Sequence, residues 1–145
     1  MQGIYNGAFN SMVAPDYDRM GEALELPGLA ADRIPYGYQR SAVVRAVNEP
    51  AVLLDHVVGA GKTGTMVMAA MELRRTGIAH RPAVVVPNHL VEQINREFVE
   101  WYPGANVLAV PTGLKASERR DWMAMAAAGD WDAVIMPQTV FERVE

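Results

Sequence analysis

The chain has 145 residues, of which 50% are hydrophobic and 21% are charged, and 13 Lys and Arg against 17 Asp and Glu give a net charge of −4. This length is about that of one domain, and the composition argues against intrinsic disorder. The absence of cysteine excludes a disulfide framework, a thiolate metal site and a cysteine nucleophile. The mild acidity argues against a chain that coats nucleic acid by bulk charge, but it is compatible with a local contact surface.

Neither a membrane span nor a secretory signal is predicted. Apolar runs such as AVLL and AVVVP are far shorter than the ~20 residues of a membrane span. The first residues, MQGIYNGAF, lack the basic and apolar regions of a signal peptide. We therefore expect a cytoplasmic protein that makes no contact with a membrane.

Residues 1–34 predict an irregular N-terminal arm. Asn, Gly and Pro residues interrupt each apolar stretch before a helical or strand period can develop. We expect this arm to lie on the surface, with Tyr5 and Phe9 as candidate anchors. The pattern QRSAVVRAVN then favours a short helix over 39–48, which Pro50 ends.

Strands and helices alternate over the rest of the chain. Short β-branched, apolar runs predict buried strands at 51–58, 83–87, 106–110 and 132–137. Helix-forming residues with plausible caps, among them Asn88, predict helices at 65–77, 89–102, 117–128 and from residue 138 onward. This alternation predicts an α/β fold with a mostly parallel sheet and right-handed crossovers.

The clearest functional signal is a phosphate-binding loop. Its residues Gly59, Ala60, Gly61, Lys62 and Thr63 lie between a predicted buried strand and a predicted helix, which is the context that a P-loop requires. Glycines let backbone N–H groups converge on phosphate oxygens without a side chain in the way. The helix adds its own unpaired N–H groups and the positive end of its dipole. The alternative is a glycine-rich turn with an ordinary surface lysine.

The loop chemistry predicts a nucleoside triphosphate and Mg²⁺, bound by residues 59–64 with Gly64 included. Lys62 can reach the β- and γ-phosphates as a mobile point charge, and the Thr63 hydroxyl can ligate Mg²⁺, so both are candidate catalytic residues. The general P-loop pattern has glycine where this sequence has His56, and only its second half matches. His56 is either a packed residue at a strand end or a contact of the nucleotide site.

From Pro35 onward the order of features resembles the first RecA-like domain of superfamily 2 helicases and, more closely, of Swi/Snf-type DNA-dependent ATPases. The segment PYGYQR resembles the aromatic–Gln segment before their phosphate loop, which implies that Gln39 contacts the adenine of ATP. A Gln amide offers the donor and the acceptor that adenine requires; a solvent-facing Gln39 is the alternative. The resemblance implies a three-layer P-loop NTPase fold over 35–145, incomplete in this chain, after an arm over 1–34.

Two further segments of the resemblance imply contacts with DNA. VVVPNHL resembles motif Ia, which implies that Asn88 and His89 contact the DNA backbone at the carboxyl end of a parallel strand. AVIMPQT stands where the family has a strand that ends in a Thr-containing DNA-contact motif, so Gln138 and Thr139 are further candidates. The alternative for these residues is helix capping.

EFVEWYP at 97–103 resembles the stretch after motif Ia in Swi/Snf-type ATPases, and we expect Leu90, Phe98 and Trp101 in the core. A narrower resemblance is to phage and plasmid proteins. The arm, LPGL at 26–29 and the loop HVVGAGKT resemble helicase-like ATPases that are often fused to adenine-specific DNA methyltransferases. This resemblance implies the cytoplasm of a bacterial or phage-infected cell.

These ATPases hold Mg²⁺ with an Asp–Glu pair at the end of a later strand, and no such pair follows the phosphate loop here. Asp130 and Asp132 precede their strand, whereas Glu142 and Glu145 lie on a predicted helix. We expect an N-terminal piece of an ATP-driven DNA translocase, poorly active without its remaining ATPase domain or a partner chain. An unpaired sheet edge would favour self-association.

Two other functions are compatible with the sequence. A small-molecule P-loop kinase would use the same loop, but it needs an acceptor-binding aspartate for which no convincing candidate is present. A non-catalytic nucleotide-binding or interaction module fits the acidic net charge and the missing Asp–Glu pair.

Overall fold

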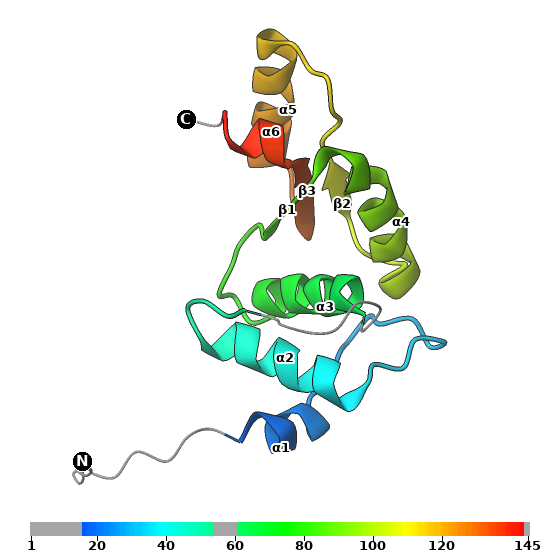
Figure 1. Ribbon diagram of the computed structural model, residues 1–145. Helices are drawn as coiled ribbons and strands as arrows, with labels where there is room; N and C mark the ends of the chain where they lie inside the picture. The colour runs from blue at the N-terminus through cyan, green and yellow to red at the C-terminus, as the bar shows by residue number, and fades with distance from the viewer. Residues whose placement is uncertain (1–15, 54–60, 144–145) are drawn as a thin grey trace, which may run out of the picture.

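The computed structural model describes residues 16–53 and 61–143 (Figure 1). The helices are α1 (Tyr17–Glu22), α2 (Gly37–Asn48), α3 (Lys62–Arg75), α4 (Val91–Trp101), α5 (Ala116–Ala128) and α6 (Gln138–Phe141), with the 3₁₀ turn η1 (Asn88–Leu90). The strands are β1 (Ala83–Val86), β2 (Val107–Ala109) and β3 (Ala133–Pro137). No helix within the described ranges is long and apolar enough to cross a membrane.

The three strands form a parallel sheet in the order β1-β3-β2. Val86 of β1 is in register with Pro137 of β3, and Ala109 of β2 is in register with Ile135. The α/β class and the parallel sheet predicted from the sequence are confirmed. In the predicted strand at 51–58, residues 51–53 have no regular structure and 54–58 lie outside the described residues.

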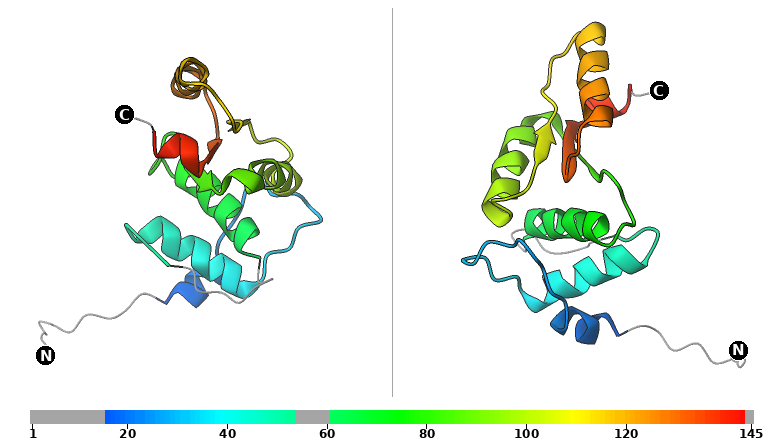
Figure 2. Two further views of the ribbon diagram at one scale, coloured as in Figure 1. Left: turned by 45° about the horizontal axis from the view of Figure 1, so that its top comes forward. Right: turned by 180° about the vertical axis from the view of Figure 1, so that it is seen from behind.

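Helices cover both faces of the sheet. On one face α3 and α4 pack on Val84, Val86 and Ile135, and Phe98 of α4 is fully buried there. On the other face α5 and α6 pack on Val134 and Met136 (Figure 2). Helix α2 lies against the side of α3 that faces away from the sheet, and α1 lies against α2. The sheet is therefore the middle of three layers, consistent with part of a RecA-like fold.

The segment predicted as an irregular arm contains a helix, α1, so that part of the prediction was wrong. The Asp16 side chain caps it by accepting from the Arg19 N–H at 3.1 Å. Gly21 allows close approach to α2, since a Cβ there would lie 2.9 Å from the Ser41 nitrogen. The Arg40 guanidinium donates to the carbonyls of Gly21, at 2.8 Å, and Leu24. The candidate anchors Tyr5 and Phe9 lie outside the described residues.

One guanidinium joins the end of α3 to the start of the sheet. Arg74 donates to Asp130 at 2.6 Å, to Asp132 at 2.9 Å and to the carbonyl of His80. The second oxygen of Asp132 accepts from the Asn106 N–H at 2.8 Å. The Arg74 guanidinium lowers the pKa of Asp130 below its usual value. These contacts join α3 to the segments that lead into β1, β2 and β3.

We expect Arg74→Ala to lower the free energy of unfolding by about 2 kcal/mol, because it leaves the half-buried Asp132 without its cationic partner. Urea denaturation at neutral pH measures the loss. Arg96→Ala, on an exposed position of α4, is the control and should change it by less than ~0.5 kcal/mol. Because Asp130 has a lowered pKa in the folded chain, its ion pair stabilises at neutral pH and is lost as the pH falls through that pKa. The difference in the free energy of unfolding between wild type and Arg74→Ala should therefore become smaller in acid. Equal stability of the two proteins at neutral pH would contradict a stabilising role of Arg74.

Candidate nucleotide and nucleic-acid site

The described part of the phosphate loop forms the start of α3. Gly61 precedes the helix with φ of 78°, in the left-handed region that favours glycine. Lys62 and Thr63 form the first turn, where Lys62 is exposed and Thr63 is half-buried. The first N–H groups of a helix have no partner within it and favour an anion. Gly59 and Ala60 lie outside the described residues, as does His56.

Gln39 is buried beside this helix start, so the alternative of a solvent-facing glutamine was wrong. The side chain is 2% exposed. Its oxygen accepts from the Tyr36 N–H at 2.8 Å, and its nitrogen donates to the Gly61 carbonyl at 2.9 Å. The Thr65 hydroxyl also donates to that carbonyl, at 3.2 Å. Sequence reasoning missed Thr65, although its spacing of four residues from Gly61 was a signal. The adenine contact of Gln39 stays a prediction.

Gly64 has a packing reason to be glycine. It is buried in the first turn of α3, and a Cβ there would overlap the ring of Trp101 at the end of α4. The ring is also covered by the Arg33 guanidinium, 5.4 Å from its centroid. Phe98 is fully buried, and Leu90 and Trp101 pack partly buried against the same core, as expected. The nucleotide contact predicted for Gly64 stays a prediction.

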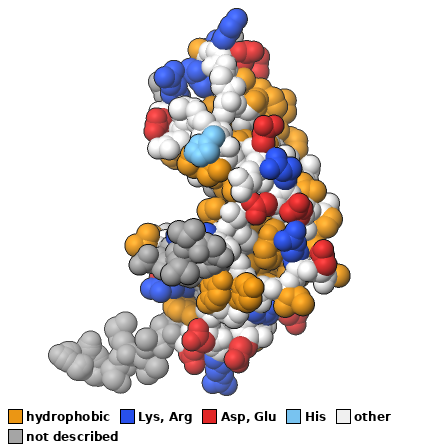
Figure 3. Space-filling view, turned by 45° about the vertical axis from the view of Figure 1, so that its right-hand side comes forward, with side chains coloured by type: hydrophobic (Ala, Val, Ile, Leu, Met, Phe, Trp, Pro, Cys, Tyr) orange, Lys and Arg blue, Asp and Glu red, His pale blue; other side chains and the backbone are white. Residues whose placement is uncertain are grey.

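The four predicted nucleic-acid residues lie together at the carboxyl edge of the sheet. Asn88 and His89 follow β1, Gln138 and Thr139 follow β3, and β1 and β3 are neighbours. All four are exposed. The Thr139 hydroxyl donates to the Asn88 side-chain oxygen at 3.2 Å, which joins the two segments directly. In space-filling view one side of the molecule is hollowed, with a histidine at the upper rim of the hollow (Figure 3).

Helix capping does not explain these four residues, so that alternative was wrong. Asn88 opens the turn η1, and the residue before α4 is Leu90, which makes no side-chain cap. Pro137 precedes α6 and likewise makes none. The Gln138 side chain instead donates to Glu142 at 3.3 Å, one turn along.

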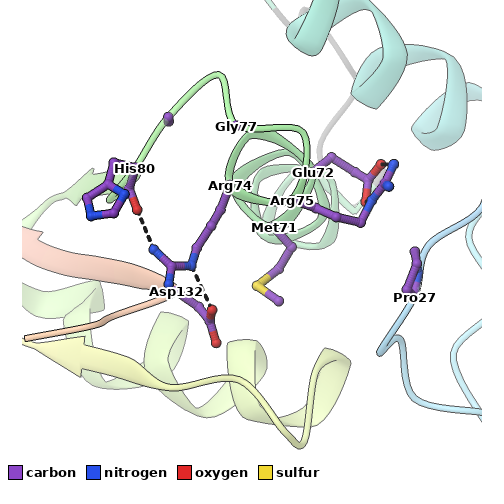
Figure 4. A pocket seen from close by; sticks show the side chains of 9 residues that line it. Pro27, Met71, Glu72, Arg74, Arg75, Gly77, His80 and Asp132 are labelled. Atoms are coloured by element: carbon purple, nitrogen blue, oxygen red, sulfur yellow. Dashed lines mark hydrogen bonds and ion pairs between the residues drawn. The ribbon is translucent and has the colours of Figure 1, made fainter.

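A cavity of about 510 Å³ lies at the other end of α3 (Figure 4). The charged side chains that line it are engaged with one another. The Arg75 guanidinium donates to both oxygens of the buried Glu72, at 2.9 and 2.8 Å, and Arg74 contacts Asp132 and the His80 carbonyl. This cavity is therefore a structural feature of the helix end, remote along α3 from Lys62.

The prediction of a bound Mg²⁺ ion depends on the chemistry of the phosphate loop. Within 16–53 and 61–143 there is no group of three or more His, Asp or Glu side chains that could hold a metal ion. A Mg²⁺ ion would use the Thr63 hydroxyl together with phosphate oxygens and water, as Mg²⁺ commonly does. This ligand role of Thr63 stays a prediction.

Comparison with known proteins gives two results. Residues 45–145 match a protein family described as probable helicase domain. The chain is also 35% identical, over 98 residues, to defense against restriction protein B of Escherichia phage P1. That alignment covers 68% of this chain but only 4% of the phage protein, so the chain spans a small part of the length of this relative.

The contact at Gly64 can be tested by Gly64→Ala. Alanine favours a helix interior over glycine by about 1 kcal/mol, but overpacking against Trp101 costs roughly 1–3 kcal/mol. We therefore expect a net destabilisation of about 1 kcal/mol in urea denaturation. The control is Gly104→Ala, where a Cβ would meet no atom within 4 Å. Unchanged or higher stability of Gly64→Ala would show that close packing does not require this glycine.

Proposed function

Since the chain belongs to the probable helicase domain family, we propose that it is the ATP-binding portion of a helicase-like, DNA-dependent ATPase. In the full-length protein, ATP hydrolysis would drive movement along DNA. The observation that carries the proposal is the start of α3, where exposed Lys62 follows Gly61 in the left-handed conformation. Lys62 would neutralise the β- and γ-phosphates, and Thr63 would ligate Mg²⁺.

The nucleic-acid part of the proposal concerns the carboxyl edge of β1 and β3. Asn88, His89, Gln138 and Thr139 would contact the DNA backbone with side-chain donors, helped by N–H groups at the starts of η1 and α6. Exposure of all four residues and the Thr139–Asn88 hydrogen bond support one shared surface. Contacts of this kind position a protein on DNA without reading its sequence.

The remaining catalytic groups would come from outside this chain. Phosphoryl transfer depends on positioning and charge stabilisation by several groups, and the sequence lacks an Asp–Glu pair after a later strand. We propose that the rest of an ATPase unit or a partner chain supplies them, so this chain alone binds ATP but turns it over slowly. The name of the phage relative supports a role of the longer protein in defence against restriction.

The nucleotide site is tested by Lys62→Ala with Mg²⁺–ATP in isothermal titration calorimetry. We expect wild-type chain to bind and the variant to bind at least tenfold more weakly, because one cation is lost from the phosphate site. Lys115→Ala, exposed at the start of α5, is the matched control and should leave the affinity unchanged. No binding by wild type at millimolar ATP would favour an interaction module, and phosphate transfer to a small acceptor would favour a kinase.

The nucleic-acid surface is tested with Asn88→Ala, His89→Ala and Thr139→Val in fluorescence anisotropy with a labelled DNA duplex. Each variant should weaken binding by roughly threefold to tenfold, because each removes a backbone contact of about 1 kcal/mol. Gln93→Ala, exposed on α4, is the control and should bind like wild type. If the three variants all match the control, DNA does not contact this edge of the sheet.

A further inference from the structure

Gln39 lies between two backbone groups of different segments. Its oxygen accepts from the Tyr36 N–H, just before α2, and its nitrogen donates to the Gly61 carbonyl, just before α3. An N–H must face an acceptor and a carbonyl must face a donor, so this pair of partners sets the orientation of the amide. Because the side chain is only 2% exposed, breaking either bond would leave a buried polar group unpaired.

The Gly61 peptide is held from two sides. Its carbonyl accepts from the Gln39 side chain at 2.9 Å, from the Thr65 N–H at 3.1 Å and from the Thr65 hydroxyl at 3.2 Å. Gln39 also lies so close that a Cβ on Gly61 would overlap its amide nitrogen. The orientation of this peptide determines where the following N–H groups of Lys62 and Thr63 point. Those are the groups that a phosphate would meet first.

We propose that Gln39 is a positioning residue of the phosphate site, which holds the Gly61 peptide so that the first N–H groups of α3 are arranged for a triphosphate. This inference rests on the proposed nucleotide binding and deepens it. In this role Gln39 acts on the triphosphate through Gly61, and the identity of the base makes no difference to its contribution. The competing role is the direct adenine contact implied by the family resemblance.

The two roles are separated by Gln39→Met, which keeps the length of the side chain and removes both hydrogen bonds. Calorimetry would compare binding of Mg²⁺ complexes of ATP, GTP and inorganic tripolyphosphate to the full chain. We expect all three affinities to fall by a similar factor of about ten, which corresponds to 1.4 kcal/mol. Gln93→Met, on the exposed side of α4, is the matched control and should bind all three ligands like wild type.

Other patterns would overturn the proposal. A loss confined to ATP would assign Gln39 to the base, and unchanged binding of all three ligands would leave it no role in the site. If Gln39→Met does not fold, nuclear magnetic resonance of wild type decides the question. The side-chain amide signals of Gln39 should then shift alike with tripolyphosphate and with ATP, whereas a shift with ATP alone contradicts positioning.

A measurement without ligand tests the contact between Gln39 and the Gly61 carbonyl separately from nucleotide binding. Amide hydrogen exchange of Thr65, whose N–H donates to the Gly61 carbonyl, should be at least fivefold faster in Gln39→Met than in Gln93→Met, because that carbonyl loses its contact with the Gln39 side chain. If wild type binds none of the ligands but this difference is present, the nucleotide proposal fails and the positioning contact stands. Equal exchange rates would overturn the positioning contact itself.

Discussion

Parallel pairing of β3 on both of its sides is the constraint on which the described structure depends. All five residues of β3 are buried, and the strand pairs with β1 on one side and β2 on the other. Parallel neighbours must end at the same edge of a sheet, so the segments after β1 and β3 emerge side by side. The Thr139–Asn88 hydrogen bond is a direct consequence of that register. Asn88 and Thr139, 51 positions apart in sequence, are brought together by backbone pairing of their strands.

Helix α3 is held at its start, along its middle and at its end by contacts with other segments. Val67, Met68 and Ala70 anchor its middle in the core that it shares with α4 and one face of the sheet. At its start, Gln39 holds the Gly61 carbonyl; at its end, Arg74 contacts Asp130 and Asp132. A helix held at both ends and packed along its middle has little freedom to tilt. The exposed Lys62 is thereby presented from a rigid support, which a phosphate site requires.

Local patterns were enough to predict much of this fold, and tertiary contacts explain the rest. The β-branched runs at 83–87, 106–110 and 132–137 each contain a strand, as predicted. Burial on both faces holds for β3, whereas exposed and buried residues alternate along β1. Helix α1 escaped prediction since its six residues are stabilised by packing on α2 and by Arg40 from a distant segment. Burial of Gln39 depends on Gly61, 22 residues away, and no local pattern could reveal that bond. Asn88 opens a 3₁₀ turn, whereas local sequence favoured a cap.

We propose that this chain binds a triphosphate at the start of α3 and DNA at the carboxyl edge of β1 and β3. Chemical-shift mapping of the isotope-labelled chain tests it most directly, with Mg²⁺–ATP and a DNA duplex added in separate titrations. ATP should shift the amide signals of 61–65, and DNA should shift those of 88–89 and 138–139. Shifts that cluster instead around the cavity at Arg74 and Glu72, or no shifts at either predicted surface, would contradict the claim.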